Sequence, residues 1–244
     1  MEKTLIQRPG TGRCSINFDF TSADQRQILQ YLQENGYQLM GFKGATGPNQ
    51  IPSGVPAWFV IHFGYMFGTE EIYYEPEYKV YAFNKAVIVP NTTIQMQALS
   101  QGIPLGTAIS FHSDGTFSRA ESASEGIITV RNERYPGTPN LTIGLAAKVN
   151  GVFQPFCAFT SFSQGQVSMK PNEKIVLFAS QVNMDSGTVI GNSMAPGGEF
   201  TFSAENRQFD LQIMRRTYGI ANAPGGAPVE SVPAGQSLIQ LLNT

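Results

Sequence analysis

The sequence predicts an all-β fold of two pseudo-repeated antiparallel β-sandwich-like units with one short N-terminal helix. Three observations lead to this prediction. The segment from Ile72 to Ile94 returns, at a constant offset, as the segment from Val167 to Val189. One segment has the apolar period and the caps of a convincing helix. Elsewhere, glycine, proline and asparagine separate short runs of alternating apolar and polar residues.

The repeat is the main support for two units. With Pro76 placed on Pro171 the two copies need no gap, and similar residues coincide: Lys79 with Lys174, Val80 with Ile175, Phe83 with Phe178, Val87 with Val182 and Thr93 with Thr188. Unrelated strands rich in Val, Phe and Lys also align by chance, which is the alternative interpretation. A true duplication predicts that Phe83 and Phe178 are both buried.

The first part of the chain is predicted to contain an arm, a strand and the helix. Residues 1–13 carry proline and glycine and few large apolar groups, so we interpret them as an arm. The run from Ser15 to Phe20 alternates apolar and polar residues, which is typical of a half-buried strand. Thr21 or Ser22 can cap the helix that follows, and Gly36 can end it in the left-handed conformation.

Short strands joined by turns are predicted for the rest of the chain. Asp114-Gly115 and Asn150-Gly151 each stand between strand-like runs, and both favour the positive φ angles that two-residue hairpin turns require. Residues 132–140 contain two prolines and a glycine and follow neither the helix period nor the strand period. We therefore place the boundary between the two units in this segment.

These observations divide the chain into three segments. Residues 1–136 hold the arm, the helix and the first β unit, residues 137–218 hold the second β unit, and residues 219–244 form a Pro/Gly-rich tail. The tail offers little apolar surface to offset the entropy of ordering it, except at its end. That end is an apolar hook, which we expect to reach a groove on the same chain or on a neighbour. The hook residues are Leu238, Ile239, Leu241 and Leu242.

Composition limits the partners that the protein can have. Charged residues make up 14% of the chain and the net charge is -2, whereas an average globular protein carries roughly 25% charged residues. No cluster of basic residues extends beyond Arg215-Arg216, so no nucleic-acid-binding surface is expected. No segment has the apolar length of a signal-peptide core or a membrane span, and the compartment is left open.

The inventory of catalytic side chains is small, and we predict no enzyme. Only His62 and His112 could act as histidine general bases. A cysteine nucleophile would need a histidine in contact, and the two cysteines, Cys14 and Cys157, are interpreted as buried thiols. No spacing among these four residues matches a metal site. We therefore expect no catalytic residue, no metal and no cofactor.

Aromatic residues are concentrated between Trp58 and Phe83, and some of them are candidates for recognition. Tyr73 and Tyr74 are adjacent, so they point to opposite faces of a strand, and one faces away from the core unless that face is also covered. Tyrosine and tryptophan combine an apolar body with a polar tip, which suits sugars, lipid interfaces and protein partners. The candidate ligand-binding or partner-binding residues are Trp58, Tyr65, Tyr73, Tyr74 and Tyr78.

Three functional hypotheses follow from these observations. The first is a non-catalytic binding or self-assembling structural protein that forms homo-oligomers through its terminal segments, with the four hook residues as the self-association site. The second is a membrane-active, cytolysin-like pore-forming toxin that binds a lipid surface or a carbohydrate through the aromatic residues of the first half. A hydrolase is the third hypothesis.

Overall fold

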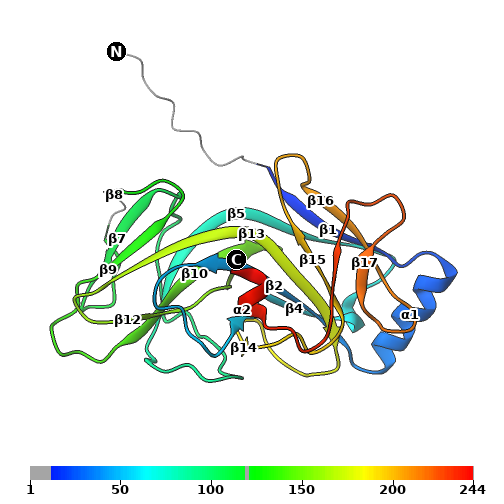
Figure 1. Ribbon diagram of the computed structural model, residues 1–244, viewed down its shortest axis with the longest axis horizontal. Helices are drawn as coiled ribbons and strands as arrows, with labels where there is room; N and C mark the ends of the chain where they lie inside the picture. Colours follow the sequence, from blue (N-terminus) through cyan, green and yellow to red (C-terminus); the bar gives the residue numbers. More distant parts are fainter. Residues whose placement is uncertain (1–11, 119–120, 244) are drawn as a thin grey trace, which may run out of the picture.

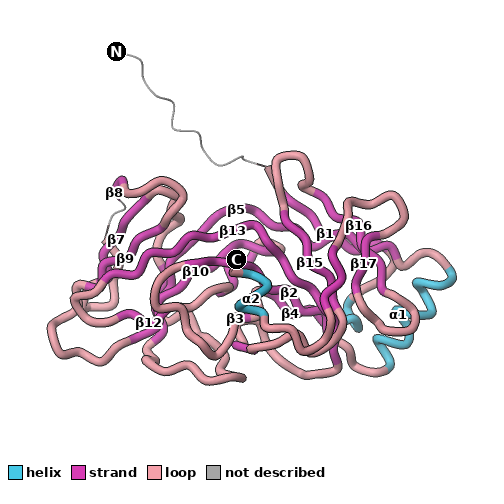
Figure 2. The backbone as a smooth tube through the Cα atoms, viewed as in Figure 1, coloured by secondary structure: helices cyan, strands magenta, loops and turns pink. Residues whose placement is uncertain are grey.

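The structure is a computed structural model that describes residues 12–118 and 121–243. As predicted, the described chain is mostly β, and two large sheets pack against each other (Figures 1 and 2). Residues 1–11 of the predicted arm lie outside the described residues.

The first sheet has eight strands. These are β1 (Cys14–Asp19), β5 (Thr69–Phe83), β6 (Ala98–Leu99), β10 (Leu141–Val149), β11 (Val152–Pro155), β12 (Phe159–Ser161), β16 (Gln208–Ile213) and β17 (Ile220–Asn222). Their order is β11-β10-β5-β1-β16-β17, with β12 beside β10 and β6 beside β5.

The second sheet also has eight strands. These are β2 (Gln38–Thr46), β4 (Phe59–His62), β7 (Thr107–Phe111), β8 (Glu121–Ser122), β9 (Ile128–Asn132), β13 (Gln166–Ser180), β15 (Gly197–Thr201) and β18 (Glu230–Val232). Their order is β18-β15-β13-β9-β7-β8, and β2 lies between β13 and β4. The remaining elements are the pair β3 (Val55–Pro56) and β14 (Val189–Ile190), the helices α1 (Ala23–Glu34) and α2 (Leu238–Leu242), and the 3-10 turn η1 (Phe63–Tyr65).

The helix signals and one of the two turn signals have the predicted structures. Ser22 caps α1 by accepting a hydrogen bond from the Gln25 backbone N–H at 3.2 Å, and Gly36 follows the helix with a φ of 65°. At Asn150-Gly151 both residues have positive φ angles, 47° and 80°. At Asp114-Gly115 only Gly115 has a positive φ, 83°, and the hairpin between Phe111 and Phe117 has a longer loop than the predicted two residues. In each case the backbone conformation is set by the residues of the turn or cap themselves.

Strand pairing differs from the prediction in two ways. Most ladders are antiparallel, but β1 pairs with β16 in parallel and β7 pairs with β9 in parallel. Neither of these pairs is joined by a hairpin, so no tight turn imposes the antiparallel direction. Strands from both sides of residue 136 also occur in each sheet, since β1 lies between β5 and β16 and β13 lies beside β2. The boundary near residue 136 therefore does not separate two sheets.

The two long strands, β5 and β13, have corresponding surroundings. Each is 15 residues long. The first part of β5 pairs with β1 and its second part with β10, while the first part of β13 pairs with β9 and its second part with β2. Phe83 and Phe178 are both buried, as expected from the repeat. The duplication itself stays a prediction.

The C-terminal segment is ordered along the body, which corrects the expectation that the tail before the hook has too little apolar surface to be ordered. β17 pairs with β16 and β18 pairs with β15, so backbone hydrogen bonds to two sheet edges hold a segment that has little apolar surface. The chain then ends in α2, which packs against β2 and β13 near the middle of the molecule, whereas α1 lies at one end (Figure 1).

Candidate functional site

The C-terminal helix α2 fills a groove on the second sheet. Alternate residues of β13 point to opposite faces: Ile175 and Leu177 join the main core between the sheets, whereas Val176 and Phe178 face α2. We call this surface the hook groove, and its buried lining includes Met40, Phe42, Val176 and Phe178. Leu238 and Leu242 are buried in it with 0% exposure, and Ile239 and Leu241 pack at its margin.

Polar contacts fix the end of α2 in the hook groove. The ladder between β2 and β13 is irregular between Pro171 and Ile175. Beside this irregularity, the Asn172 side-chain amide donates to the Leu242 carbonyl at 2.7 Å. The Ala45 backbone N–H donates to Asn243 Oδ1 at 3.1 Å. The helix end therefore completes hydrogen bonding that the two strands do not make with each other.

Gly44 allows the close approach of α2 to β2. A Cβ atom at this position would lie 2.3 Å from the Leu242 carbonyl oxygen, which belongs to the backbone and has no rotamer with which to move away. Just before α2, Ser193 accepts from the Gly235 N–H at 2.7 Å and donates its own N–H to the Gln236 carbonyl at 2.9 Å. The groove thus fits this segment in shape and in hydrogen bonding.

The five candidate aromatic residues do not form one surface. Trp58, Tyr74 and Tyr78 are interior, with exposures of 0%, 1% and 3%, which corrects the prediction that they bind a ligand or partner. Tyr74 and Tyr78 lie on β5, whose inward face the second sheet covers, and the Trp58 ring packs edge-on against the Tyr74 ring. Tyr73 points away from the core, as its adjacency to Tyr74 implies, and its ring lies 4.0 Å from the Arg13 guanidinium. Tyr65 is 76% exposed.

Tyr65 and Phe67 protrude from the connection between β4 and β5. Phe67 is 70% exposed, while the neighbouring Phe63 and Met66 are buried at 0% and 1%. The buried residues hold the backbone and the exposed residues present their rings outward. Two exposed rings on an anchored segment are a candidate contact surface.

A buried polar network lies between the sheets, and the sequence did not reveal it. Lys43 has 0% side-chain exposure, and its Nζ donates to Glu173 Oε2 at 2.8 Å and to the Asn172 carbonyl. Glu173 Oε1 accepts from the Tyr78 hydroxyl at 2.7 Å and from the Tyr74 hydroxyl at 3.1 Å. Burial lowers the pKa of Lys43, and burial raises the pKa of both tyrosines well above its ordinary value.

This network joins the two sheets. Lys43 is on β2, Glu173 is on β13, and the two tyrosines are on β5. A buried charge is tolerated when it is paired and hydrogen-bonded, and the Lys43 ammonium has a carboxylate and a carbonyl as acceptors and the Tyr74 ring 4.8 Å away. The one available signal was a lysine inside the apolar run of Gln38–Thr46. We interpret the network as a device that fixes the alignment of the sheets.

The cysteines and histidines do not come together. Cys14 and Cys157 are both free and buried, as predicted. Burial raises the pKa of the Cys157 thiol to about 12, so little of it is thiolate near neutral pH. His62 lies against the side chain of Gln38, and His112 Nδ1 is 3.5 Å from a Glu133 carboxylate oxygen. Among the described residues, no group of three or more His, Cys, Asp and Glu could hold a metal ion.

The surface depressions of the described chain include the following two. The larger, about 500 Å³, lies along β1, β5 and β16 and is lined by four carboxylates. Each carboxylate already has a partner in the chain: Asp19 with Thr21, Glu70 with the Phe67 N–H, Glu71 with Arg13, and Asp210 with Asn17. The smaller, about 390 Å³, contains Arg134.

In the described part of the chain, no helix is long and apolar enough to span a membrane.

Comparison of the chain with protein-family models, with curated proteins and with solved structures finds no match. No relative therefore supplies a role for the hook groove, the exposed aromatic residues or the depressions. Their function has to be argued from their geometry.

Proposed function

We propose that this protein is a non-catalytic structural protein that assembles with copies of itself by exchanging its C-terminal hook. The observation that carries the proposal is the burial of Leu238 and Leu242, each at 0% exposure, in a groove shaped for the end of the chain. Every copy carries the same hook and the same groove. A hook that docks on a neighbour recreates each contact that it makes within its own chain.

The energy of the hook supports this exchange. Burying a leucine side chain stabilises by about 1.5–3 kcal/mol, so Leu238 and Leu242 together hold the hook with about 3–6 kcal/mol. The segment from 223 to 229, APGGAPV, connects the hook region to β17 and contains two prolines and two glycines. A connector of this composition contains no helix or long strand. It can therefore change its path to a neighbouring copy without the unfolding of such an element. Reciprocal exchange therefore costs little besides the entropy of association.

Light scattering of the intact chain tests assembly directly. We expect an oligomer for the intact chain and a monomer after Leu238→Asp, because a carboxylate cannot enter the apolar groove without a large desolvation cost. Leu99→Asp is the matched control, since Leu99 is 41% exposed on β6 and should leave the oligomer unchanged. A monomeric intact chain, or an oligomer that persists after Leu238→Asp, contradicts the proposal.

A complementation experiment tests exchange itself. Gly44→Leu blocks the groove and leaves the hook intact, whereas Leu238→Asp damages the hook and leaves the groove intact. Each variant alone should be monomeric. Their mixture should form a one-to-one complex, in which the hook of the first variant docks on the groove of the second. A mixture that stays monomeric while the intact chain is oligomeric contradicts exchange of the hook, and single variants that stay oligomeric show assembly through another surface.

The second candidate function is binding to a lipid or sugar surface, followed by damage to the membrane that carries it. It is favoured by the exposure of Tyr65 and Phe67, at 76% and 70%, on an anchored segment. Dye release from liposomes separates this candidate from self-assembly. Leakage at low protein concentration that is lost in the double variant Tyr65→Ser/Phe67→Ser would support this second candidate. Liposomes that stay intact at saturating protein concentration would exclude it.

A further inference from the structure

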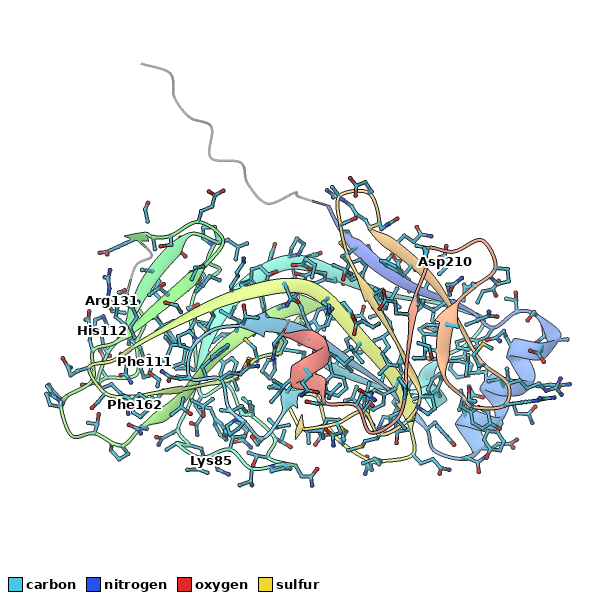
Figure 3. All side chains as sticks on the ribbon, in the orientation of Figure 1. Lys85, Phe111, His112, Arg131, Phe162 and Asp210 are labelled. Carbon is cyan, nitrogen blue, oxygen red and sulfur yellow. The ribbon has the colours of Figure 1, made fainter. Side chains whose placement is uncertain are left out.

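The smaller surface depression lies away from both the hook groove and the exposed Tyr65 and Phe67. It forms where the turn after β7 meets the end of β5, the start of β6 and the start of β10. Phe111 and His112 mark this end of the molecule, opposite the end that carries α1 (Figure 3). The volume of about 390 Å³ is in the range of small-molecule sites.

The depression has an apolar floor and a polar rim. Ala82, Phe111 and Leu141 form the floor, and each is at most 5% exposed. The rim is polar: Asn84, Gln97, His112, Ser113, Asp114 and Arg134. A small apolar floor with several convergent polar groups is typical of a ligand site, because the floor excludes water and the rim fixes orientation.

Arg134 is held in place without a carboxylate partner. Its Nε donates to Asn132 Oδ1 at 3.1 Å and its Nη2 donates to the Pro139 carbonyl at 2.6 Å. Among the described residues, no carboxylate forms an ion pair with it, whereas Arg131 on the adjoining strand pairs with Glu121 at 3.3 Å. Partial burial lowers the pKa of Arg134. The guanidinium is thus oriented, partly desolvated and free to pair with an external anion.

The other rim groups offer more donors than acceptors. Gln97 Oε1 accepts from the Asn84 backbone N–H at 2.6 Å, which leaves the Gln97 amide N–H groups to point elsewhere. Ser113 Oγ accepts from a backbone N–H at 3.0 Å, so its own hydrogen remains to be donated. The N–H and the hydroxyl of Thr116 both donate to Asp114 Oδ1, which leaves the second oxygen of this carboxylate to accept from a ligand hydroxyl. A ligand rich in oxygen acceptors suits this rim.

We propose that this depression, the Arg134 pocket, binds an acidic sugar of the hexuronic acid type. The sugar carboxylate pairs with the guanidinium, ring hydroxyls accept from Asn84, Gln97 and Ser113, and the apolar face of the ring lies on the floor. A phosphate ligand fits less well. Phosphate sites use several cations or the N–H groups of a helix N-terminus, and no lining residue of the pocket belongs to a helix.

Calorimetric titration of the full chain with glucuronate tests this assignment. Glucose provides the same hydroxyls without the carboxylate, while acetate and inorganic phosphate provide charge without the ring. We expect glucuronate to bind more tightly than all three. Equal affinity for glucose, or tighter binding of acetate or phosphate, overturns the assignment to an acidic sugar, and so does the absence of glucuronate binding.

Two variants connect binding to the rim residues. Arg134→Gln should weaken glucuronate binding about 10-fold to 100-fold, because a hydrogen bond to a charged group is lost. Arg131→Gln, a surface arginine outside the pocket, is the matched control and should bind as the unaltered chain does. Gln97→Leu leaves the anchors of Arg134 intact and should weaken both glucuronate and glucose about 2-fold to 12-fold. Unchanged glucuronate affinity in both Arg134→Gln and Gln97→Leu contradicts the proposed site.

Discussion

The Tyr78 hydroxyl donates to Glu173 Oε1 at 2.7 Å, and these two residues are 95 positions apart. Thr93 Oγ1 and Thr188 Oγ1, also 95 positions apart, are hydrogen-bonded at 2.9 Å. This separation equals the offset of the predicted repeat, so each contact joins two residues that the alignment of Pro76 with Pro171 places in the same position. The duplication stays a prediction, and the contacts themselves link the β5 half of the chain to the β13 half.

The first prediction concerns the charge balance of that network. Glu173→Gln leaves the Lys43 ammonium buried without its counter-ion, which we expect to lower the free energy of unfolding by about 3 kcal/mol. This is the lower end of the range for a buried pair, because Glu173 keeps 33% side-chain exposure. Urea unfolding at pH 7 measures the change.

The double variant Lys43→Met/Glu173→Gln provides the control for this first prediction. It removes both charges and keeps a side-chain oxygen as the acceptor for the Tyr74 and Tyr78 hydroxyls, so it should be more stable than Glu173→Gln alone. Equal stability of Glu173→Gln and the unaltered chain would show that the ion pair is not buried as described.

The second prediction is a loss of stability at alkaline pH. Burial raises the pKa of Tyr74, Tyr78 and Tyr81 well above 10.0, the ordinary value to which they return on unfolding. Their contribution is fully present below pH 10 and is lost as the pH rises further, because only the unfolded chain releases these protons. Burial lowers the pKa of Lys43, so its effect on stability becomes more favourable as the pH rises. This is the effect of one group, whereas three tyrosines have the opposite effect.

Absorbance of tyrosinate during a pH titration checks this second prediction. The chain has nine tyrosines. Tyr74, Tyr78 and Tyr81 should ionise together, well above pH 10 and in step with the loss of the circular dichroism signal. A single titration of all tyrosines around pH 10 with the fold intact would contradict it.

The third prediction concerns thiol reactivity. Burial raises the pKa of Cys157 to about 12 and also raises the pKa of Cys14. At pH 8 a disulfide reagent should therefore react slowly with the folded chain and quickly in urea, because the thiolate is the reactive form. The variant Cys157→Ser separates the reaction rate of Cys14 from that of Cys157. Rapid reaction of Cys157 in the folded chain would show that the first sheet opens locally.

The fourth prediction concerns the fit of the hook. Gly44→Ala places a methyl group against the Leu242 backbone oxygen, so α2 should detach and its amide hydrogens should exchange faster. We expect a loss of about 2–4 kcal/mol, comparable to overpacking a core together with exposing part of the hook groove. Gly64→Ala is the matched control, since a Cβ there meets nothing within 4 Å. Equal hydrogen exchange of α2 in both variants would mean that the hook is not seated as described.

Side-chain chemistry close in the sequence determined the local elements. Ser22 and Gly36 bound the helix because a cap and a left-handed glycine act within one turn of the backbone. Gly151 forms a hairpin turn for the same reason, since its φ of 80° is accessible to glycine without strain. The all-β class follows from many such signals together.

Tertiary structure alone decided the partners of each strand and the exposure of each aromatic residue. Tyr65 and Tyr74 have the same chemistry, yet one is 76% exposed and the other 1%, because burial depends on which sheet packs over a strand. The ion pair of Lys43 and Glu173 joins residues 130 positions apart, and the hook meets a groove built from β2 and β13. Strand pairing uses the same backbone hydrogen bonds whichever strands are joined, so local sequence does not select among distant partners. Packing of the whole chain makes that selection.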